Sequence, residues 1–388
     1  METFRKSFIK KRLLGKASAK AQSAMEYLMA YGWAILIVAV VLVLGSLYIL
    51  GLFNSFAIPS GIVAYVPITL SNSQSSATPS PFQQMIQINE SNYANYIAYN
   101  GKIANFEFFT RSGKVLPAWI ENNYSIENNY SIENNSSGTL IIWVKLPNGI
   151  PASSSLTIYL GFASKSTNLL SSSGTTGIGE APQLSCPNPF NTIGCSTYAK
   201  YDDGASVFNV YQNFAGSSCP SGWSCQSGTK IDNGATLNGA DINSTSAYFP
   251  QILDAYVVST FGNVKGEAIE YFTNSKNNAF NINQPYLLHG SIGSTVNGNI
   301  TANTNGIPPA FTVPYIQSLG WNGSTLYWWA DYANEYTERT SLSSSSPYYI
   351  QIAVWPSGVP AVIQWVRTRA FPPNGVMPSV IFGGLSSA

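Results

Sequence analysis

The sequence offers one carboxylate pair with a spacing worth testing for glycoside hydrolysis, Glu267 and Glu270. That reaction needs two acids about 5 to 9.5 Å apart across one sugar. The glutamates are three positions apart, so a regular strand would direct them to opposite faces. His289 is the single histidine of the chain, and no Ser–His–Asp arrangement can be proposed around it. We therefore expect no catalytic residue and no enzyme, with a surface glycosidase as an alternative.

Aromatic and basic side chains give more material for binding than for catalysis. Aromatic rings beside amides and acids are typical of a sugar platform, and residues 321–332 have this composition. Within strands, alternate residues share a face, which groups Tyr327 with Trp329. The same rule groups the arginines of a later strand, which could orient an acidic ligand or pair with sheet neighbours. A core role for all of these is the alternative. The candidate ligand contacts are Tyr327, Trp329, Tyr332, Trp365, Arg367 and Arg369.

All four cysteines lie in one part of the sequence, at Cys186, Cys195, Cys219 and Cys225. Outside a membrane, an even number of cysteines favours disulfides, and four cysteines allow about three pairings. We prefer Cys186–Cys195 with Cys219–Cys225, because each closes a loop that contains Pro or Gly. The alternative is a metal site, but the chain lacks a Cys-x-x-Cys motif and has one histidine. No metal site is predicted.

A short acidic turn, Asp202-Asp203-Gly204, could ligate calcium. Carboxylate oxygens are suitable Ca²⁺ ligands, yet an Asp-Asp-Gly turn without a metal is the more common structure. We predict no required cofactor and keep calcium as the alternative.

The glycosylation motif Asn-x-Ser/Thr occurs repeatedly, including within a six-residue repeat over residues 121–137. The motif permits glycosylation on a surface that faces the cell exterior, and it is common by chance in Asn- and Ser-rich sequence. The candidate acceptors are Asn89, Asn123, Asn129, Asn134, Asn135, Asn243, Asn299 and Asn322.

The N-terminal region has the charge pattern of a membrane-inserted helix. Residues 27–53 carry no charged side chain, and as a helix they extend roughly 40 Å against an apolar bilayer core of about 30 Å. Seven basic residues precede the segment, and no basic residue follows it until Lys102. This asymmetry predicts a cytoplasmic N-terminus and an extracellular location for residues 54–388. An uncleaved signal anchor would have the same topology.

The sequence Gln-Ser-Ala-Met-Glu-Tyr at 22–27 stands directly before the apolar segment and behind the basic leader. This order resembles the archaeal class III signal peptide of type IV pilin-like proteins, which a prepilin peptidase processes. The resemblance implies a leader over 1–21, a cut between Ala21 and Gln22, and an assembly helix over 22–55. In a filament core built from such helices with other pilin subunits, the Glu26 carboxylate needs a positive partner, for which we expect the amine of Gln22 from the same or a neighbouring subunit. The alternative is an acid at the membrane interface that stays solvated. Ala21 departs from the Gly that is more frequent before the cut.

The outer region reads as all-β, because short alternating or β-branched runs are separated by clusters of Gly, Pro, Asn and Ser. Two antiparallel sandwiches fit its length. Residues 61–170 resemble a domain of unassigned function, through Phe-Glu-Phe-Phe at 106–109 and Trp-Val-Lys-Leu-Pro at 143–147. Residues 182–388 resemble a concanavalin A-like lectin/glucanase sandwich, through their motifs at 201–208 and 365–380. The predicted fold is therefore two β-sandwiches behind one transmembrane helix.

Composition agrees with a surface protein and excludes a nucleic-acid partner. Aromatic residues make up 13% of the chain. Its 19 Lys and Arg are balanced by 18 Asp and Glu, so no basic patch is available to bind phosphates. We expect a type IV pilin-like protein with a structural or adhesive role, in the cell membrane or a pilus, that displays a glycan-binding sandwich. The alternative is a monomeric, membrane-anchored carbohydrate-binding protein. The expected partners are the membrane, the peptidase, other subunits and surface glycans.

Overall fold

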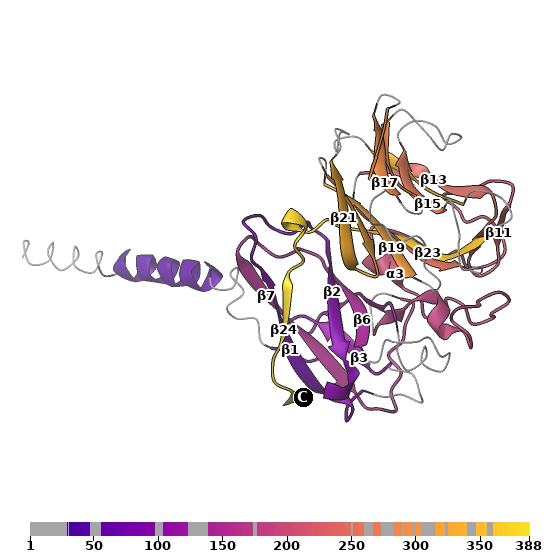
Figure 1. Ribbon diagram of the computed structural model, residues 1–388. Coiled ribbons are helices and arrows are strands. Elements are labelled where there is room, and N and C mark those ends of the chain that lie inside the picture. Colours follow the sequence, from indigo (N-terminus) through magenta and orange to yellow (C-terminus); the bar gives the residue numbers. More distant parts are fainter. Residues whose placement is uncertain are drawn as a thin grey trace, which may run out of the picture. The chain divides into compact units, whose positions relative to one another are not determined.

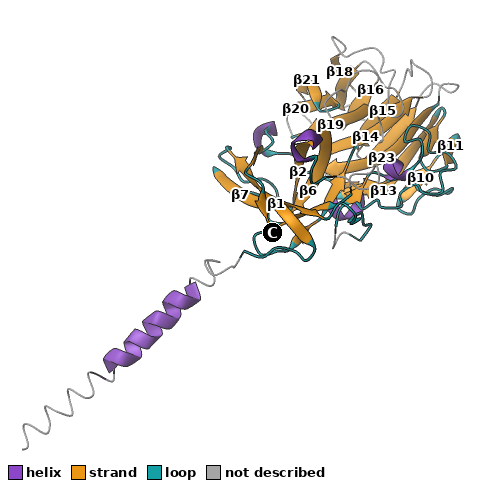
Figure 2. Cartoon of the chain, turned by 90° about the horizontal axis from the view of Figure 1, so that it is seen from below, coloured by secondary structure: helices purple, strands orange, loops and turns teal. Residues whose placement is uncertain are grey.

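The chain divides into two compact units, Met1–Ala57 and Ile58–Ala388. A computed structural model describes residues 29, 31–46, 56–97, 104–122, 139–173, 177–249, 251–259, 267–272, 283–288, 291–296, 299–303, 315–322, 325–339, 347–354 and 360–388. Few short helices accompany the strands of the second unit (Figure 2).

In the first unit, residues 31–46 form a helix whose large apolar side chains are exposed, among them Trp33, Ile35 and Leu42. Within the described part of the chain, no helix combines the length and apolarity needed to cross a membrane. The predicted leader 1–21, the Ala21–Gln22 junction and Glu26 lie outside the described residues.

The first sandwich of the second unit contains two sheets. One has the order β24-β1-β7-β3-β4, with β25 also pairing β1, and the other has the order β2-β6-β5-β8. Apolar residues alternate with more exposed ones along β1, so that Val66, Ile68 and Leu70 are buried in the core. The bounds are β1 (Ile62–Asn72), β2 (Phe82–Asn89), β3 (Phe106–Phe109), β4 (Val115–Leu116), β5 (Ala118–Ile120), β6 (Thr139–Leu146), β7 (Ser154–Ala163), β8 (Gly179–Glu180), β24 (Ser379–Phe382) and β25 (Ser386–Ser387).

The second sandwich packs a sheet of order β10-β13-β22-β15-β16-β17-β18 against one of order β11-β12-β23-β14-β19-β20-β21. Its core joins Ile242 and Ile352 of the first of these sheets to Leu253, Leu319 and Ile363 of the second. The strands are β10 (Trp223–Cys225), β11 (Thr229–Ile231), β12 (Ala235–Leu237), β13 (Ala240–Tyr248), β14 (Ile252–Ser259), β15 (Glu267–Phe272), β16 (Asn283–Leu288), β17 (Ser291–Val296), β18 (Asn299–Asn303), β19 (Tyr315–Trp321), β20 (Thr325–Ala330), β21 (Ala333–Arg339), β22 (Tyr348–Val354) and β23 (Ala361–Arg369).

The second unit also contains short elements outside the strand orders above. They are η1 (Glu90–Tyr93), η3 (Pro182–Ser185), α3 (Gly204–Val207), β9 (Val210–Gln212), which pairs β23, and η4 (Pro373–Gly375). The prediction that the chain after the N-terminal helix is built mostly from antiparallel β-sandwiches is confirmed.

The end of the chain returns to the first sandwich. β24 pairs with β1, from Ile68 opposite Phe382 to Ser71 opposite Ser379. The predicted second sandwich, 182–388, includes these residues. Local patterning marks 379–382 as a strand but contains no information about a partner near the other end of the unit, so this assignment is corrected.

The two sandwiches lie against each other (Figure 1), and buried side chains from both form one apolar cluster. Trp119 and Trp143 of β5 and β6 belong to the same cluster as Tyr256 and Trp365 of β14 and β23. Trp119 meets Trp365 edge to face, with ring centroids 5.4 Å apart. Because these rings bury one another, the junction between the sandwiches is part of the core.

Candidate binding site between the two sandwiches

Four charged side chains lie buried at the junction. Arg367 of β23 pairs through Nε with Asp254 of β14 at 2.9 Å, and through Nη2 with Glu121, which follows β5. Arg369 also donates from Nε to Asp254, at 2.9 Å. A buried charge is tolerated only when it is paired and hydrogen-bonded, and two arginines facing two carboxylates meet this condition.

Aromatic rings enclose the guanidinium of Arg367. It lies 4.5 Å from the ring centre of Phe208, 4.6 Å from Trp365 and 4.7 Å from Trp143. Such contacts stabilise a desolvated cation. Burial lowers the pKa of Arg367, but the neighbouring Tyr332, Glu121 and Asp254 outweigh it and raise the pKa above its ordinary value. The arginine is therefore a permanent cation.

Asp254 remains ionised because the two neighbouring arginines outweigh its burial. Burial raises the pKa of this carboxyl, while Arg369 and Arg367 lower it by more, so that the pKa lies below its usual value.

A strained hairpin turn supplies one more member of this cluster. Asp331 and Tyr332 connect β20 to β21 with φ of 48° and 62°, in the left-handed region that costs non-glycine residues energy. The Tyr332 hydroxyl donates to Glu121 and accepts from Nη2 of Arg367. The Asp331 carboxylate holds the turn by accepting from the Ile316 amide at 2.8 Å. The turn thus fixes Tyr332 over the ion pairs.

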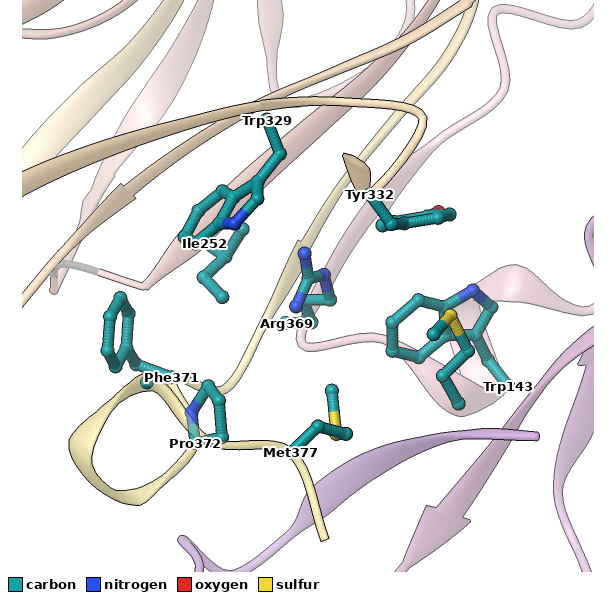
Figure 3. A pocket seen from close by; sticks show the side chains of 10 residues that line it. Trp143, Ile252, Trp329, Tyr332, Arg369, Phe371, Pro372 and Met377 are labelled. Atoms are coloured by element: carbon teal, nitrogen blue, oxygen red, sulfur yellow. The ribbon is translucent and has the colours of Figure 1, made fainter. Parts of the chain in front are cut away.

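A cavity of about 130 Å³ opens beside this cluster. Arg369 lies in its middle, with Trp329, Phe371 and Pro372 on one side and Trp143 and Met377 on the other (Figure 3). Both sandwiches contribute to its lining, which consists of Met85, Trp143, Ile252, Trp329, Tyr332, Arg369, Phe371, Pro372, Gly375 and Met377.

Stacked rings form the aromatic side of the cavity. Tyr327 stacks on Trp329 with a centroid distance of 5.6 Å and an interplanar angle of 6°, and its ring lies 5.3 Å from Phe371. Gly320 of β19 makes room for them, because a Cβ there would lie 2.6 Å from the Trp329 ring and 3.2 Å from Phe371. The absence of a side chain at this position therefore sets where Trp329 lies.

The structure brings together three of the six predicted ligand contacts. Trp329, Tyr332 and Arg369 line the cavity, and Tyr327 supports Trp329 from outside the lining. The shared face of Trp365, Arg367 and Arg369 is directed at the first sandwich.

The prediction that Trp365 and Arg367 contact a ligand is wrong. Both are completely buried, because they build the junction itself, and they present no surface to a ligand. Sequence reasoning missed Met85, Trp143, Phe371 and Met377, since the pairing of distant segments brings them to the cavity. The Phe-Pro-Pro sequence at 371–373, directly after the predicted strand that carries the two arginines, was an available signal.

The predicted disulfide pairing is present in the structure, with Cys186 bonded to Cys195 and Cys219 to Cys225. For the carboxylates of the glycosidase alternative, the structure describes the strand but not the side chains. Glu267 and Glu270 lie on β15 opposite Val354 and Gln351, their side chains are outside the described residues, and so is His289.

The acidic turn at 202–204 is occupied by protein donors. Asp202 accepts hydrogen bonds from Trp119, Tyr211, Asn213 and the Gly204 amide, at distances of 2.7 to 3.0 Å. Burial raises its pKa to about 6, against the opposing effect of these donors. Among the described residues, no group of three or more His, Cys, Asp or Glu is placed to hold a metal ion.

The candidate glycosylation sites divide into three groups. Asn243 is buried and donates to Asp241 at 2.9 Å, so the prediction of a glycan there is corrected. Asn89 and Asn322 are exposed. The sites at Asn123, Asn129, Asn134 and Asn135 lie outside the described residues, as does the side chain of Asn299 on β18.

No family model matches the chain. The chain is 28% identical over 364 residues to the uncharacterized protein 562 of Sulfolobus islandicus rod-shaped virus 1. The match covers 82% of this chain but 58% of that relative's length. The name of this relative states no biochemical activity.

Solved structures with partial similarity include a Bacillus licheniformis β-glucanase, which is 14% identical with a TM-score of 0.32 and covers 41% of this chain and 97% of its own. The carbohydrate-binding module CBM66 from Bacillus subtilis is 18% identical with a TM-score of 0.30, covering 38% and 96%. The laminarinase from Rhodothermus marinus is 10% identical with a TM-score of 0.33, covering 42% and 96%. At these values no functional argument rests on them.

Proposed function

We propose that the second unit is a glycan-binding module displayed on a surface, and that the cavity between its sandwiches is the binding site. The observation that carries this proposal is the position of Arg369 beside the aromatic wall of Trp329 and Phe371. A sugar has an apolar ring face and polar edges, and this wall with its adjacent guanidinium offers one surface for each. Ligand sites are typically apolar hollows with a few placed polar groups.

The remaining charges at the junction support a preformed site. Asp254 fixes Nε of Arg369, and the ring centres of Trp143 and Tyr332 lie 5.0 and 5.7 Å from its guanidinium. A side chain held from several sides loses little freedom when a ligand binds, which favours affinity.

The proposal includes a membrane-anchored display. Exposed apolar side chains along residues 31–46 are unfavourable in water and require an apolar environment, either lipid or other helices. We therefore propose a cytoplasmic N-terminus, removal of the leader between Ala21 and Gln22 by a prepilin peptidase, and an extracellular second unit. Glu26 would pair with the amine of a pilin-like neighbour if the helices assemble, giving the protein a structural or adhesive role. The alternative, a monomeric membrane-anchored binding protein, would have the same topology and processing but would not assemble through Glu26.

A glycan array probed with the full chain in detergent micelles tests the binding proposal. Trp329→Ala removes the aromatic wall and should weaken binding at least tenfold, whereas the exposed Phe249 serves as a control whose Phe249→Ala variant should bind normally. Absence of any bound glycan, or equal binding by Trp329→Ala, would contradict the proposal. A bound glycan that is shortened on incubation would instead favour a glycosidase.

A further inference from the structure

We propose that the cavity recognises the acetamido group of an N-acetylated sugar, with the carbonyl oxygen at Arg369 and the methyl group in the apolar recess beside it. This inference rests on the proposed glycan binding and names its ligand class. Three properties of the cavity point to it: the kind of hydrogen-bonding groups, the charge balance and the apolar lining.

The side chains that line the cavity offer donors. Arg369 has guanidinium N–H groups beyond the Nε that Asp254 occupies, and Trp329 has an indole N–H. Among the described lining side chains there is no carboxylate or amide that could accept a hydrogen bond, and the Tyr332 hydroxyl is already bonded to Glu121 and Arg367. A sugar hydroxyl is best matched by both a donor and an acceptor, whereas a carbonyl or carboxylate oxygen only accepts. The cavity therefore fits a carbonyl or carboxylate better than a hydroxyl.

Charge balance separates these two possibilities. Arg367 and Arg369 already face Asp254 and Glu121, so the buried cluster has equal numbers of positive and negative groups. A ligand carboxylate would add an uncompensated negative charge to a desolvated site, which is costly. A neutral carbonyl oxygen accepts from Arg369 without this cost.

The apolar part of the lining suits the methyl of the acetamido group. Met85, Met377, Ile252 and Pro372 surround the polar centre with apolar surface. Thioether side chains adapt their shape to small apolar groups. Met377 and Arg369 line the same cavity (Figure 3), so the methyl of a carbonyl bound at Arg369 is placed against this apolar surface and the sugar ring against Trp329.

The test measures binding of simple sugars to the full chain in detergent micelles by calorimetry. The probes are the methyl glycosides of N-acetylglucosamine, N-acetylgalactosamine, glucosamine, glucose and glucuronic acid. We expect at least one N-acetylated sugar to bind at least tenfold more tightly than glucose and glucuronic acid. Arg369→Lys keeps the charge but loses the planar fork, and it should reduce this preference about tenfold.

Met377→Phe provides an independent variant, because this half-buried residue lies outside the ion pairs. Filling the recess should abolish the preference for the N-acetyl group, with an unaltered circular dichroism spectrum as the folding control. Equal affinity for glucose and the N-acetylated sugars would overturn the inference and leave glycan binding intact. Tighter binding of glucuronic acid would overturn it in favour of an anionic ligand. Failure of every sugar and every array glycan to bind would overturn the proposed function itself.

Discussion

Arg367 and Glu121 form an ion pair across 246 positions of sequence, with side-chain exposures of 0% and 3%. One residue belongs to the second sandwich and the other to the first. Because neither charge has access to water, each requires the other, and the pair fixes how the two sandwiches meet. The cavity depends on this arrangement, since its walls come from both sandwiches.

Replacing Arg367 with Met should destabilise the second unit severely. The variant leaves Glu121 buried with no basic partner, and breaking a buried pair in this way costs about 3 to 5 kcal/mol. Urea unfolding monitored by tryptophan fluorescence measures the loss. The exposed pair Lys230–Asp232 provides the control, and Lys230→Ala should unfold like the wild type.

A double variant separates the charge from the packing. Adding Glu121→Gln to Arg367→Met removes the unpaired carboxylate and should recover part of the lost stability. No recovery would show that Arg367 acts through its ring contacts and not through the ion pair.

Gly320→Ala should impair binding by displacing Trp329. The new Cβ would lie 2.6 Å from the Trp329 ring, closer than atoms tolerate, so the ring must move. We expect at least a tenfold loss in affinity for the array glycans, and a loss of about 1 to 3 kcal/mol in unfolding free energy from overpacking. Gly384 has open space around its Cβ position, and Gly384→Ala should bind normally. Unchanged binding by Gly320→Ala would show that the position of Trp329 is unimportant.

Much of the architecture was accessible from sequence because it is local. Alternation along β1 and the Pro- and Gly-containing loops between the cysteines indicated strands and the disulfide pairing. The site was only partly accessible. Alternation put Arg367 and Arg369 on one face, but the environment of that face depends on Glu121 and Trp143, which arrive from another sandwich. One arginine is consequently structural and the other lines the cavity, a difference that spacing alone does not contain.

Asp202 should make the stability of the fold fall as pH rises through the weakly acidic range. Its pKa is about 6 in the folded protein against an ordinary 3.8, so between these values the folded state keeps a proton that the unfolded state has released. The contribution of Asp202 to stability is then greatest below pH 4 and is lost up to about pH 6, by roughly 3 kcal/mol.

Asp202→Asn does not titrate and reveals this contribution. The unfolding free energy of the wild type minus that of the variant should decrease between pH 4 and pH 6.5 and be constant above. A difference that grows with pH would mean that the donors around Asp202 outweigh its burial.

The N-terminal processing stays a prediction with a direct readout. Mass spectrometry of protein from the cell surface should give a mature chain that begins at Gln22. Glu26→Gln should leave insertion and cleavage intact but suppress polymer, because the amine of Gln22 loses its counter-charge in an apolar bundle. Equal polymer yield from wild type and variant would exclude that role of Glu26, and an intact Met1 would exclude the cut.

The central claim is that a sugar binds between the two sandwiches, and a crystal structure with a bound array glycan tests it most directly. We predict a sugar ring against Trp329, with an acceptor oxygen within hydrogen-bonding distance of the Arg369 guanidinium and Met377 in contact with the ligand. A sugar bound elsewhere on the second unit, with this cavity empty, would contradict the account.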